Sequence, residues 1–162
     1  VMSCAIIAEL TAWAKDQDKT LFDVLLDIWI KFGLYHEGLI SITKKGKAGA
    51  QEIQQIMKTI RNTPPIFLND ILVTDIIDYS NLTHLETKTK IILPLDSHKS
   101  NVLQFITEDG SRISIRPSGT EPKIKIYFSV YSSLQSKNEL KEKKDQLDTL
   151  ISKLSKSLLK HF

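Results

Sequence analysis

The order of apolar and polar positions divides the chain into a helical start, a strand-rich middle and a helical end. Residues 2–14 and 21–32 carry apolar side chains at helical spacing, and we expect the first of these helices to bury much of its surface. Thr20, followed three residues later by Asp23, is a capping-box signature for the second helix. Gly33 stands where a glycine commonly ends a helix. The two helices need a partner surface that so short a segment does not supply.

A strand and turn at 38–46 are expected to precede an amphipathic helix, which ends at the Asn-Thr-Pro-Pro sequence of 62–65. Strand-like runs follow, and Pro94 pushes one of them toward the edge of a sheet. The runs lie around residues 71–79, 90–95 and 102–107. Asp109-Gly110 then gives the strongest hairpin signal in the chain.

Two strands with clean alternation flank the most unusual loop of the sequence. Before it, Ile113 and Ile115 alternate with polar residues; after it, Lys123, Lys125 and Tyr127 alternate with apolar ones. The chain ends in a long helix whose apolar stripe consists of Leu140, Leu147, Leu150, Ile151, Leu154 and Leu158.

This order of elements predicts an α+β fold. Residues 38–162 should form one domain with a mostly antiparallel sheet packed by two helices. Residues 1–37 should be two helices left from a truncated α/β domain. The chain enters helix-like sequence at once, without a start methionine or a basic lead-in, so we expect a fragment cut from a longer protein.

Composition narrows the function classes. Of 162 residues, 41% are hydrophobic and 25% charged, as in soluble globular proteins, and a net charge of +3 is too small to imply nucleic-acid binding by itself. Cys4 is the single cysteine, which excludes an intrachain disulfide and a Cys-rich metal site and fits a cytoplasmic location. No apolar run approaches the roughly 18–20 residues that span a bilayer, so no membrane partner is expected. The four histidines lie far apart, without the spacing of metal ligands.

Residues 116–122, Arg-Pro-Ser-Gly-Thr-Glu-Pro, join the two alternating strands and carry candidate binding chemistry. The two prolines stiffen the loop, which lowers the entropy lost when a ligand binds. Arg116 offers a planar fork of donors that matches two phosphate oxygens. Ser118 and Thr120 add hydroxyls, and Gly119 is expected to let backbone N–H groups turn inward into an anion-binding concavity.

The charges around the loop also favour the binding of an anion. Lys125 emerges on the same face as Arg116, and Lys123 and Glu121 stand as supporting residues. Glu121 is expected either to orient Arg116 or Lys125 or to be structural. Because rigidity, donors and positive charge coincide, we predict that the loop binds phosphate or carboxylate; the alternative is a rigid turn with incidental side chains.

The stretch "RPSGTEPKIKIY" resembles the C-terminal phosphate-binding signature of the α-D-phosphohexomutases, the phosphoglucomutase/phosphomannomutase family. The strands around it and "DKTLFDVLLDIWIKFGLYHEG" extend the resemblance over most of the chain. It implies the end of domain 3 in residues 1–37 and all of domain 4 in 38–162. It also implies that domain 4 clamps the phosphate of a hexose phosphate. The implied phosphate contacts are Arg116, Ser118, Gly119, Thr120 and Lys125.

The resemblance further implies an enzyme that interconverts hexose 1- and 6-phosphates through a phosphoserine and a bisphosphorylated intermediate, with Mg²⁺ on an Asp-rich loop. The sequence contains no Ser-His-Asn-Pro stretch, no Asp-x-Asp-x-Asp loop and no Gly-Glu-x-Ser sugar loop. No catalytic or metal-binding residue is therefore assigned here, and the chain should be inactive without the missing N-terminal domains. The alternative is a non-enzymatic α+β domain whose basic loop binds nucleic acid or an acidic partner. The absence of aromatic residues near the loop weighs against it.

Overall fold

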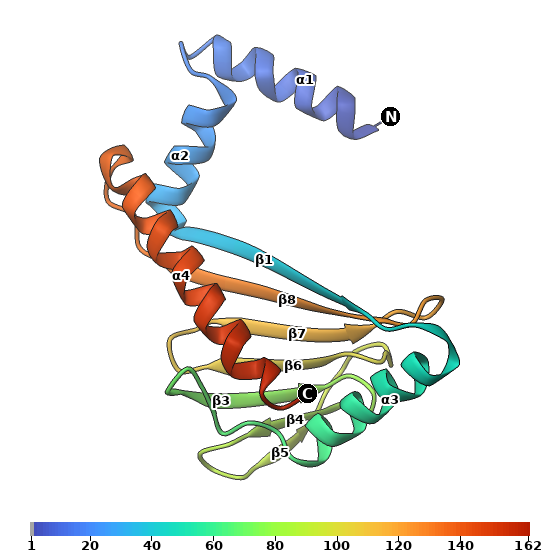
Figure 1. The fold of residues 1–162 in the computed structure, drawn as a ribbon. Helices are drawn as coiled ribbons and strands as arrows, with labels where there is room; N and C mark the ends of the chain where they lie inside the picture. Colours follow the sequence, from blue (N-terminus) through green and yellow to red (C-terminus); the bar gives the residue numbers. More distant parts are fainter. Residues whose placement is uncertain (1) are drawn as a thin grey trace.

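The structure, a computed structural model, describes residues 2–162 (Figure 1). Two helices come first, α1 (Met2–Lys15) and α2 (Leu21–Phe32), followed by the long strand β1 (Leu34–Thr43) and the helix α3 (Gly46–Asn62). The strands of the middle are β2 (Phe67–Leu68), β3 (Ile71–Asp78), β4 (Thr83–Glu86), β5 (Ile92–Pro94), β6 (Leu103–Thr107), β7 (Arg112–Pro117) and β8 (Lys123–Ser132). A 3-10 turn, η1 (Lys137–Glu139), leads into the last helix, α4 (Leu140–Leu159).

All strands belong to one antiparallel sheet. Its order is β1-β8-β7-β6-β3-β4-β5, and β2 pairs with β3 outside this path. The first strand in the chain, β1, therefore pairs with the last, β8, so the two ends of the strand-forming segment lie side by side. The predicted α+β class and antiparallel sheet are confirmed.

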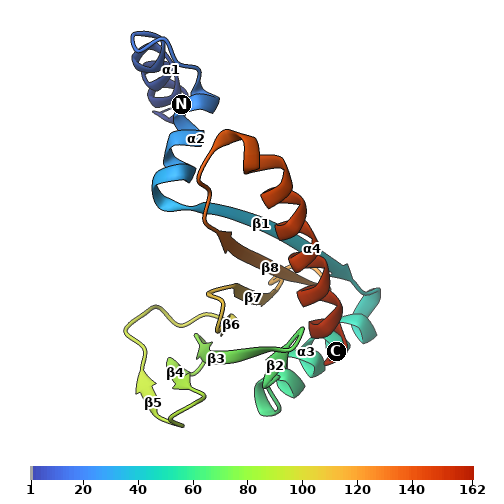
Figure 2. The ribbon, with the colours of Figure 1, turned by 90° about the vertical axis from the view of Figure 1, so that its left-hand side faces the viewer.

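Helices α3 and α4 cover the same face of the sheet, as Figures 1 and 2 show from two directions. The apolar stripe of α3 packs there, with Ile53 and Ile60 buried, and α4 contributes Leu147 and Leu154. The sheet side of this core consists of Leu103, Phe105, Ile113, Ile115, Ile124, Ile126, Phe128 and Val130. Leu103 and Phe105 belong to β6, and the other six are the inward positions that the alternation of β7 and β8 predicted. Burial of this one face stabilises the fold and leaves the opposite face of the sheet to solvent.

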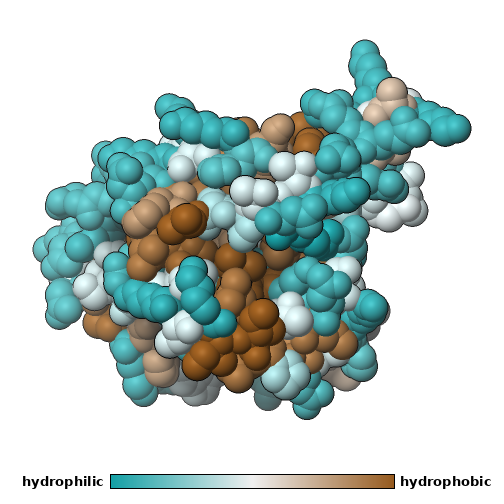
Figure 3. Space-filling model, turned by 90° about the horizontal axis from the view of Figure 1, so that it is seen from below, coloured by the Kyte–Doolittle hydropathy of each residue, from teal (hydrophilic) through white to brown (hydrophobic). Residues whose placement is uncertain are grey.

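The β5 end of the sheet is less completely covered. The edge strand β5 is exposed along its length, and Pro94 lies in it as predicted for an edge. Seen from below, this end shows a large apolar area (Figure 3). Exposed apolar side chains at this end of the chain's sheet are Ile66, Phe67, Ile91, Ile92 and Leu93.

The first helix leaves its apolar surface exposed, as expected for a helix whose partner surface this chain does not supply. Ala14 is its single buried residue, and Trp13 is 51% exposed. Figure 1 shows α1 standing apart from the sheet. The reason is that α1 meets only α2 and lies against neither the sheet nor the helices that cover it. Helical spacing predicted the helix correctly but not what covers it.

The second helix is attached to the domain through a few contacts. Its capping box is present, with Thr20 and Asp23 bonded to each other's backbone N–H groups at 3.2 and 3.0 Å. Leu26 is buried, Trp29 packs on the core, and the Lys144 ammonium of α4 lies 4.9 Å from the centroid of the Trp29 ring. These contacts fix the direction in which β1 enters the sheet.

One boundary and two short strands differ from the sequence expectation. Strand β1 begins at Leu34, so the division expected between residues 37 and 38 falls inside a strand that pairs with β8 along its whole length. The strands β2 (Phe67–Leu68) and β4 (Thr83–Glu86) were missed, because each is too short to show a clear alternation of apolar and polar residues. The assignment of residues 1–37 to a preceding domain stays a prediction.

Candidate anion-binding site

The loop between β7 and β8 is pinned at its base. The Ser118 N–H donates to the Lys123 carbonyl oxygen at 2.8 Å, which continues the pairing of the two strands into the loop. The Lys44 N–H donates to the Pro122 carbonyl oxygen, also at 2.8 Å, and ties the loop to the end of β1. With a proline at each end, the tip of the loop has little freedom to rearrange.

Arg116 and Lys125 lie directly opposite each other on β7 and β8. Both face away from the core, because their neighbours Ile115, Ile124 and Ile126 are fully buried. Neither cation lies within salt-bridge distance of a carboxylate among residues 2–162. The pair is therefore a concentration of positive charge on the open face of the sheet.

A hollow of about 460 Å³ lies between the loop and this cationic pair. Its lining consists of Arg116, Pro117, Ser118, Gly119, Thr120, Glu121, Lys123, Lys125 and Tyr127. All five residues predicted to contact phosphate, and both supporting residues, thus border one space. Their roles as phosphate contacts stay predictions.

Several donors of the loop are free of internal partners. Among the described residues, the hydroxyl of Thr120 and the N–H groups of Gly119 and Thr120 have no hydrogen-bond partner. The Ser118 hydroxyl oxygen accepts from the Glu121 N–H at 3.3 Å, which leaves its own hydrogen to donate. Free donors beside two cations are a suitable environment for the oxygens of an anion.

Gly119 keeps a backbone conformation that other residues can also adopt. The glycines of residues 2–162 with positive φ are Gly33, Gly46 and Gly110, so Gly119 does not provide a left-handed turn of the backbone. A Cβ built on Gly119 would meet nothing within 4 Å. The glycine therefore leaves open space at the mouth of the hollow, where a ligand can approach the backbone closely.

Glu121 pairs with Lys123, not with Arg116 or Lys125. The Lys123 ammonium, through its hydrogen bond and its charge, holds the pKa of the Glu121 carboxyl below its ordinary value, and the charge of Lys125 adds to this effect. The supporting pair is thus internally neutralised. Arg116 and Lys125 are left without an ion pair to any carboxylate of residues 2–162.

A second hollow, of about 530 Å³, lies on the other side of the same loop. Ala50, Ile53 and Met57 of α3 line it together with residues 117–122. The loop is thus a wall between a polar hollow on the open face and a more apolar one beside α3.

Tyr127 is a residue of the site that the sequence reasoning missed. It lies on β8 two residues after Lys125, on the same face, and lines the polar hollow. The expectation that no aromatic residue neighbours the loop was therefore wrong. The signal was present in the strict alternation of β8, which places residues 123, 125 and 127 on one face.

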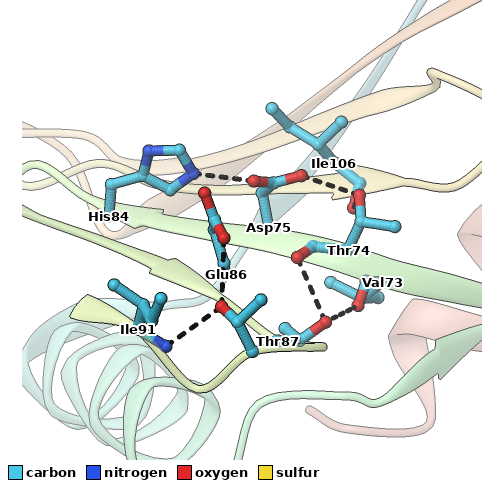
Figure 4. Close-up of polar contacts among 9 residues, drawn as sticks. Val73, Thr74, Asp75, His84, Glu86, Thr87, Ile91 and Ile106 are labelled. Atoms are coloured by element: carbon cyan, nitrogen blue, oxygen red, sulfur yellow. Dashed lines mark hydrogen bonds and ion pairs between the residues drawn. The ribbon is translucent and has the colours of Figure 1, made fainter. Parts of the chain in front are cut away.

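Two histidines pair with carboxylates away from the loop. His84 lies 2.7 Å from Asp75, whose carboxylate also accepts from the Thr74 hydroxyl at 2.7 Å (Figure 4). Burial alone would raise the pKa of Asp75, but these hydrogen bonds and the His84 charge outweigh it and lower the pKa. His36 lies 2.8 Å from Asp148 and links β1 to α4. Both pairs join elements of the fold.

Within residues 2–162, no three histidine, cysteine or carboxylate side chains gather where they could hold a metal ion. Nor does any helix in this range have the length and apolar character to cross a membrane.

Comparison with known proteins identifies the relatives of the chain. Residues 42–146 match the family profile described as phosphoglucomutase/phosphomannomutase, C-terminal domain. A phosphoglucomutase of Staphylococcus aureus strain N315 is 37% identical over 127 residues, and that of strain MRSA252 is 35% identical over 125 residues. Each match covers 77% of this chain and 22% of the relative, so the chain spans about a fifth of the length of these proteins.

Among solved structures, the chain resembles the exocytosis-sensitive phosphoprotein pp63/parafusin, a phosphoglucomutase of Paramecium, in its open form. The TM-score is 0.46 at 21% identity, over 73% of this chain and 19% of the other. The family profile covers most of residues 38–162, including the loop and the strands on both sides of it. The chain therefore belongs to the phosphoglucomutase/phosphomannomutase family and contains its C-terminal domain.

Proposed function

We propose that the hollow beside residues 116–122 binds the phosphate group of a sugar phosphate. The observation that carries this proposal is the position of Arg116 opposite Lys125, with no carboxylate of residues 2–162 within salt-bridge distance of either. Like charges directly opposite on a sheet destabilise the fold unless a counter-charge is bound. The free hydroxyl and N–H donors of the loop add directional contacts for phosphate oxygens.

For the longer protein, we propose the reaction of a phosphohexomutase, which interconverts hexose 1- and 6-phosphates through a phosphoserine and a bisphosphorylated intermediate. The phosphoserine, the sugar-contacting loop and the carboxylates that hold Mg²⁺ would come from domains outside these residues. This domain would hold the phosphate that is not being transferred. Positioning of this kind makes a large contribution to phosphoryl transfer.

We further propose that the 162 residues bind hexose phosphate without converting it. Support comes from the sequence, which contains neither the phosphoserine motif nor the Asp-rich metal loop of the family. The cytoplasmic location stays a prediction.

Calorimetric titration with glucose 1-phosphate and glucose 6-phosphate tests the proposed binding. We expect saturable binding at millimolar concentrations or weaker, and Arg116→Ala should weaken it by about tenfold or more, because a charge-assisted hydrogen bond is lost. Arg112→Ala is the matched control: Arg112 lies on the same strand and face but outside the hollow, and its loss should leave the affinity unchanged.

Equal losses for the two arginine variants would mean that only general positive charge attracts the ligand. Salt-dependent binding of RNA, together with indifference to sugar phosphates, would instead favour the nucleic-acid alternative.

A further inference from the structure

We propose that Tyr127 contacts the sugar ring of the bound ester and gives this domain a preference for hexose phosphates over inorganic phosphate. The inference rests on the proposed function and adds a sugar-reading residue to the phosphate contacts. It assigns the ring of Tyr127 as a platform under the hexose.

The position of Tyr127 is set by the register of the strands. It follows Lys125 by two residues on β8, so the two side chains share a face and stand about 7 Å apart along the strand. Both line the same hollow. A ligand whose phosphate lies between Arg116 and Lys125 therefore brings its next group over Tyr127.

The ring of Tyr127 is available to a ligand. Its side chain is 39% exposed, and within residues 2–162 no other aromatic ring or cation stacks on it. Tyr35 and Tyr131 on the same face differ, because their rings contact each other with centroids 5.1 Å apart. A free aromatic face can pack against the apolar C–H face of a pyranose, while its hydroxyl remains in reach of water and sugar oxygens.

The neighbours of Tyr127 across the sheet supply hydrogen-bonding groups. Ser114 stands opposite Tyr127, and Gln104 stands opposite Ser114, so the three form one row on the open face. The Gln104 side-chain amide donates to the Ser114 hydroxyl oxygen at 2.8 Å, which leaves the serine hydrogen free to donate elsewhere.

This row runs parallel to the cationic row of Arg116 and Lys125. A neutral aromatic and hydroxyl-bearing row next to a cationic one matches a ligand with an uncharged polyhydroxyl ring next to a phosphate.

The test compares glucose 6-phosphate with inorganic phosphate in calorimetric titrations of the 162-residue chain. Tyr127→Ala should weaken glucose 6-phosphate binding by about five- to tenfold and leave phosphate binding within about twofold. Tyr127→Phe should keep most of the affinity, because the ring remains. Tyr131→Ala is the matched control, as it removes a tyrosine of similar exposure, 43%, from the same strand and face but from outside the hollow.

Equal weakening of both ligands by Tyr127→Ala would overturn the inference and leave the anion site standing, because the residue would then only shape the hollow. Equal affinities of the unmodified chain for the two ligands would also overturn it. If the unmodified chain bound neither ligand, the proposed function would fail, and the inference with it.

Discussion

Arg116 of β7 and Lys125 of β8 are direct cross-strand partners on the open face of the sheet. Two cations at such a position repel each other, and the sheet gains nothing from their proximity. The Glu121 carboxylate, whose pKa the Lys125 charge helps to lower, is itself paired with Lys123. The repulsion lowers the stability of the sheet at this position, and a bound anion would offset it.

Removal of the second cation should separate binding from stability. Lys125→Met keeps the aliphatic stem but removes the charge, so we expect weaker phosphate binding by about threefold to tenfold. The free energy of unfolding should stay the same or rise by a few tenths of a kcal/mol, because the repulsion from Arg116 is gone. Titration calorimetry and urea denaturation measure the two effects. Lys58→Met, on the exposed side of α3 and outside both hollows, is the control and should change neither quantity. A marked loss of stability in Lys125→Met would show that the lysine is structural.

Gly33 should tolerate no side chain. Its φ of 97° and ψ of 155° lie in a region that is essentially restricted to glycine, and a Cβ would stand 2.0 Å from a ring carbon of Tyr131. We expect Gly33→Ala to lower the free energy of unfolding by about 1–3 kcal/mol. In the double variant with Tyr131→Ala, only the steric part should be recovered. Full recovery in chemical denaturation experiments would mean that the backbone conformation carries no strain.

Asp75 should contribute stability that depends on pH in the acid range. Its pKa is lowered in the folded state by hydrogen bonds from His84 and Thr74, against the opposing effect of burial. The stabilisation is therefore present above the ordinary carboxyl pKa, about 4, and is lost as the pH falls through the lower folded-state pKa. Glu86 lies opposite Asp75 on β4, so its carboxyl also faces the pair and has to be distinguished from Asp75 in the experiment.

Asp75→Asn should accordingly flatten the pH dependence of the unfolding free energy below about pH 4, compared with the unmodified chain. Glu86→Gln serves as the control. Identical profiles for Asp75→Asn and the unmodified chain would contradict the assignment.

Leu26 should be important for holding α2 against the domain, whereas side chains on the exposed surface of α1 should contribute little to stability. Leu26→Ala removes a buried side chain and should cost about 2–5 kcal/mol in the contacts that hold α2. Leu10→Ala, in the exposed surface of α1, should change stability by less than about 0.5 kcal/mol. Hydrogen exchange of the α2 amides is the measurement, and Leu26→Ala should speed it. Uniformly slow exchange throughout residues 2–33 of a monomer would contradict the exposed α1 described above.

The sequence predicted best those elements whose pattern is set by a single buried face. The alternation of Ile113 and Ile115, and of Ile124 and Ile126, gave both strands and their orientation, because one side of the sheet is fully buried. The same alternation places Arg116 and Lys125 together on the open face. It did not reveal that they are direct partners, because register depends on how the loop closes.

Other features depend on contacts between distant segments, which no local pattern contains. The exposure of Trp13 follows from α1 meeting neither the sheet nor its covering helices. Glu121 pairs with Lys123 because of how the loop between Ser118 and Pro122 folds, which the sequence pattern does not show. The open space beside Gly119 likewise depends on how the loop is placed against its surroundings. Tyr127 was visible in the alternation of β8, but its chemistry became relevant only once the hollow was located.

The measurement that tests the central claim most directly is an NMR titration of the ¹⁵N-labelled 162-residue chain with glucose 6-phosphate. If the hollow beside the loop binds the phosphate ester, the amide signals of Gly119 and Thr120, whose N–H groups are free, should shift saturably together with those around Arg116 and Lys125. The same signals should stay still in Arg116→Ala. An unmodified chain whose residues 116–125 show no shifts at high ligand concentration would contradict the claim.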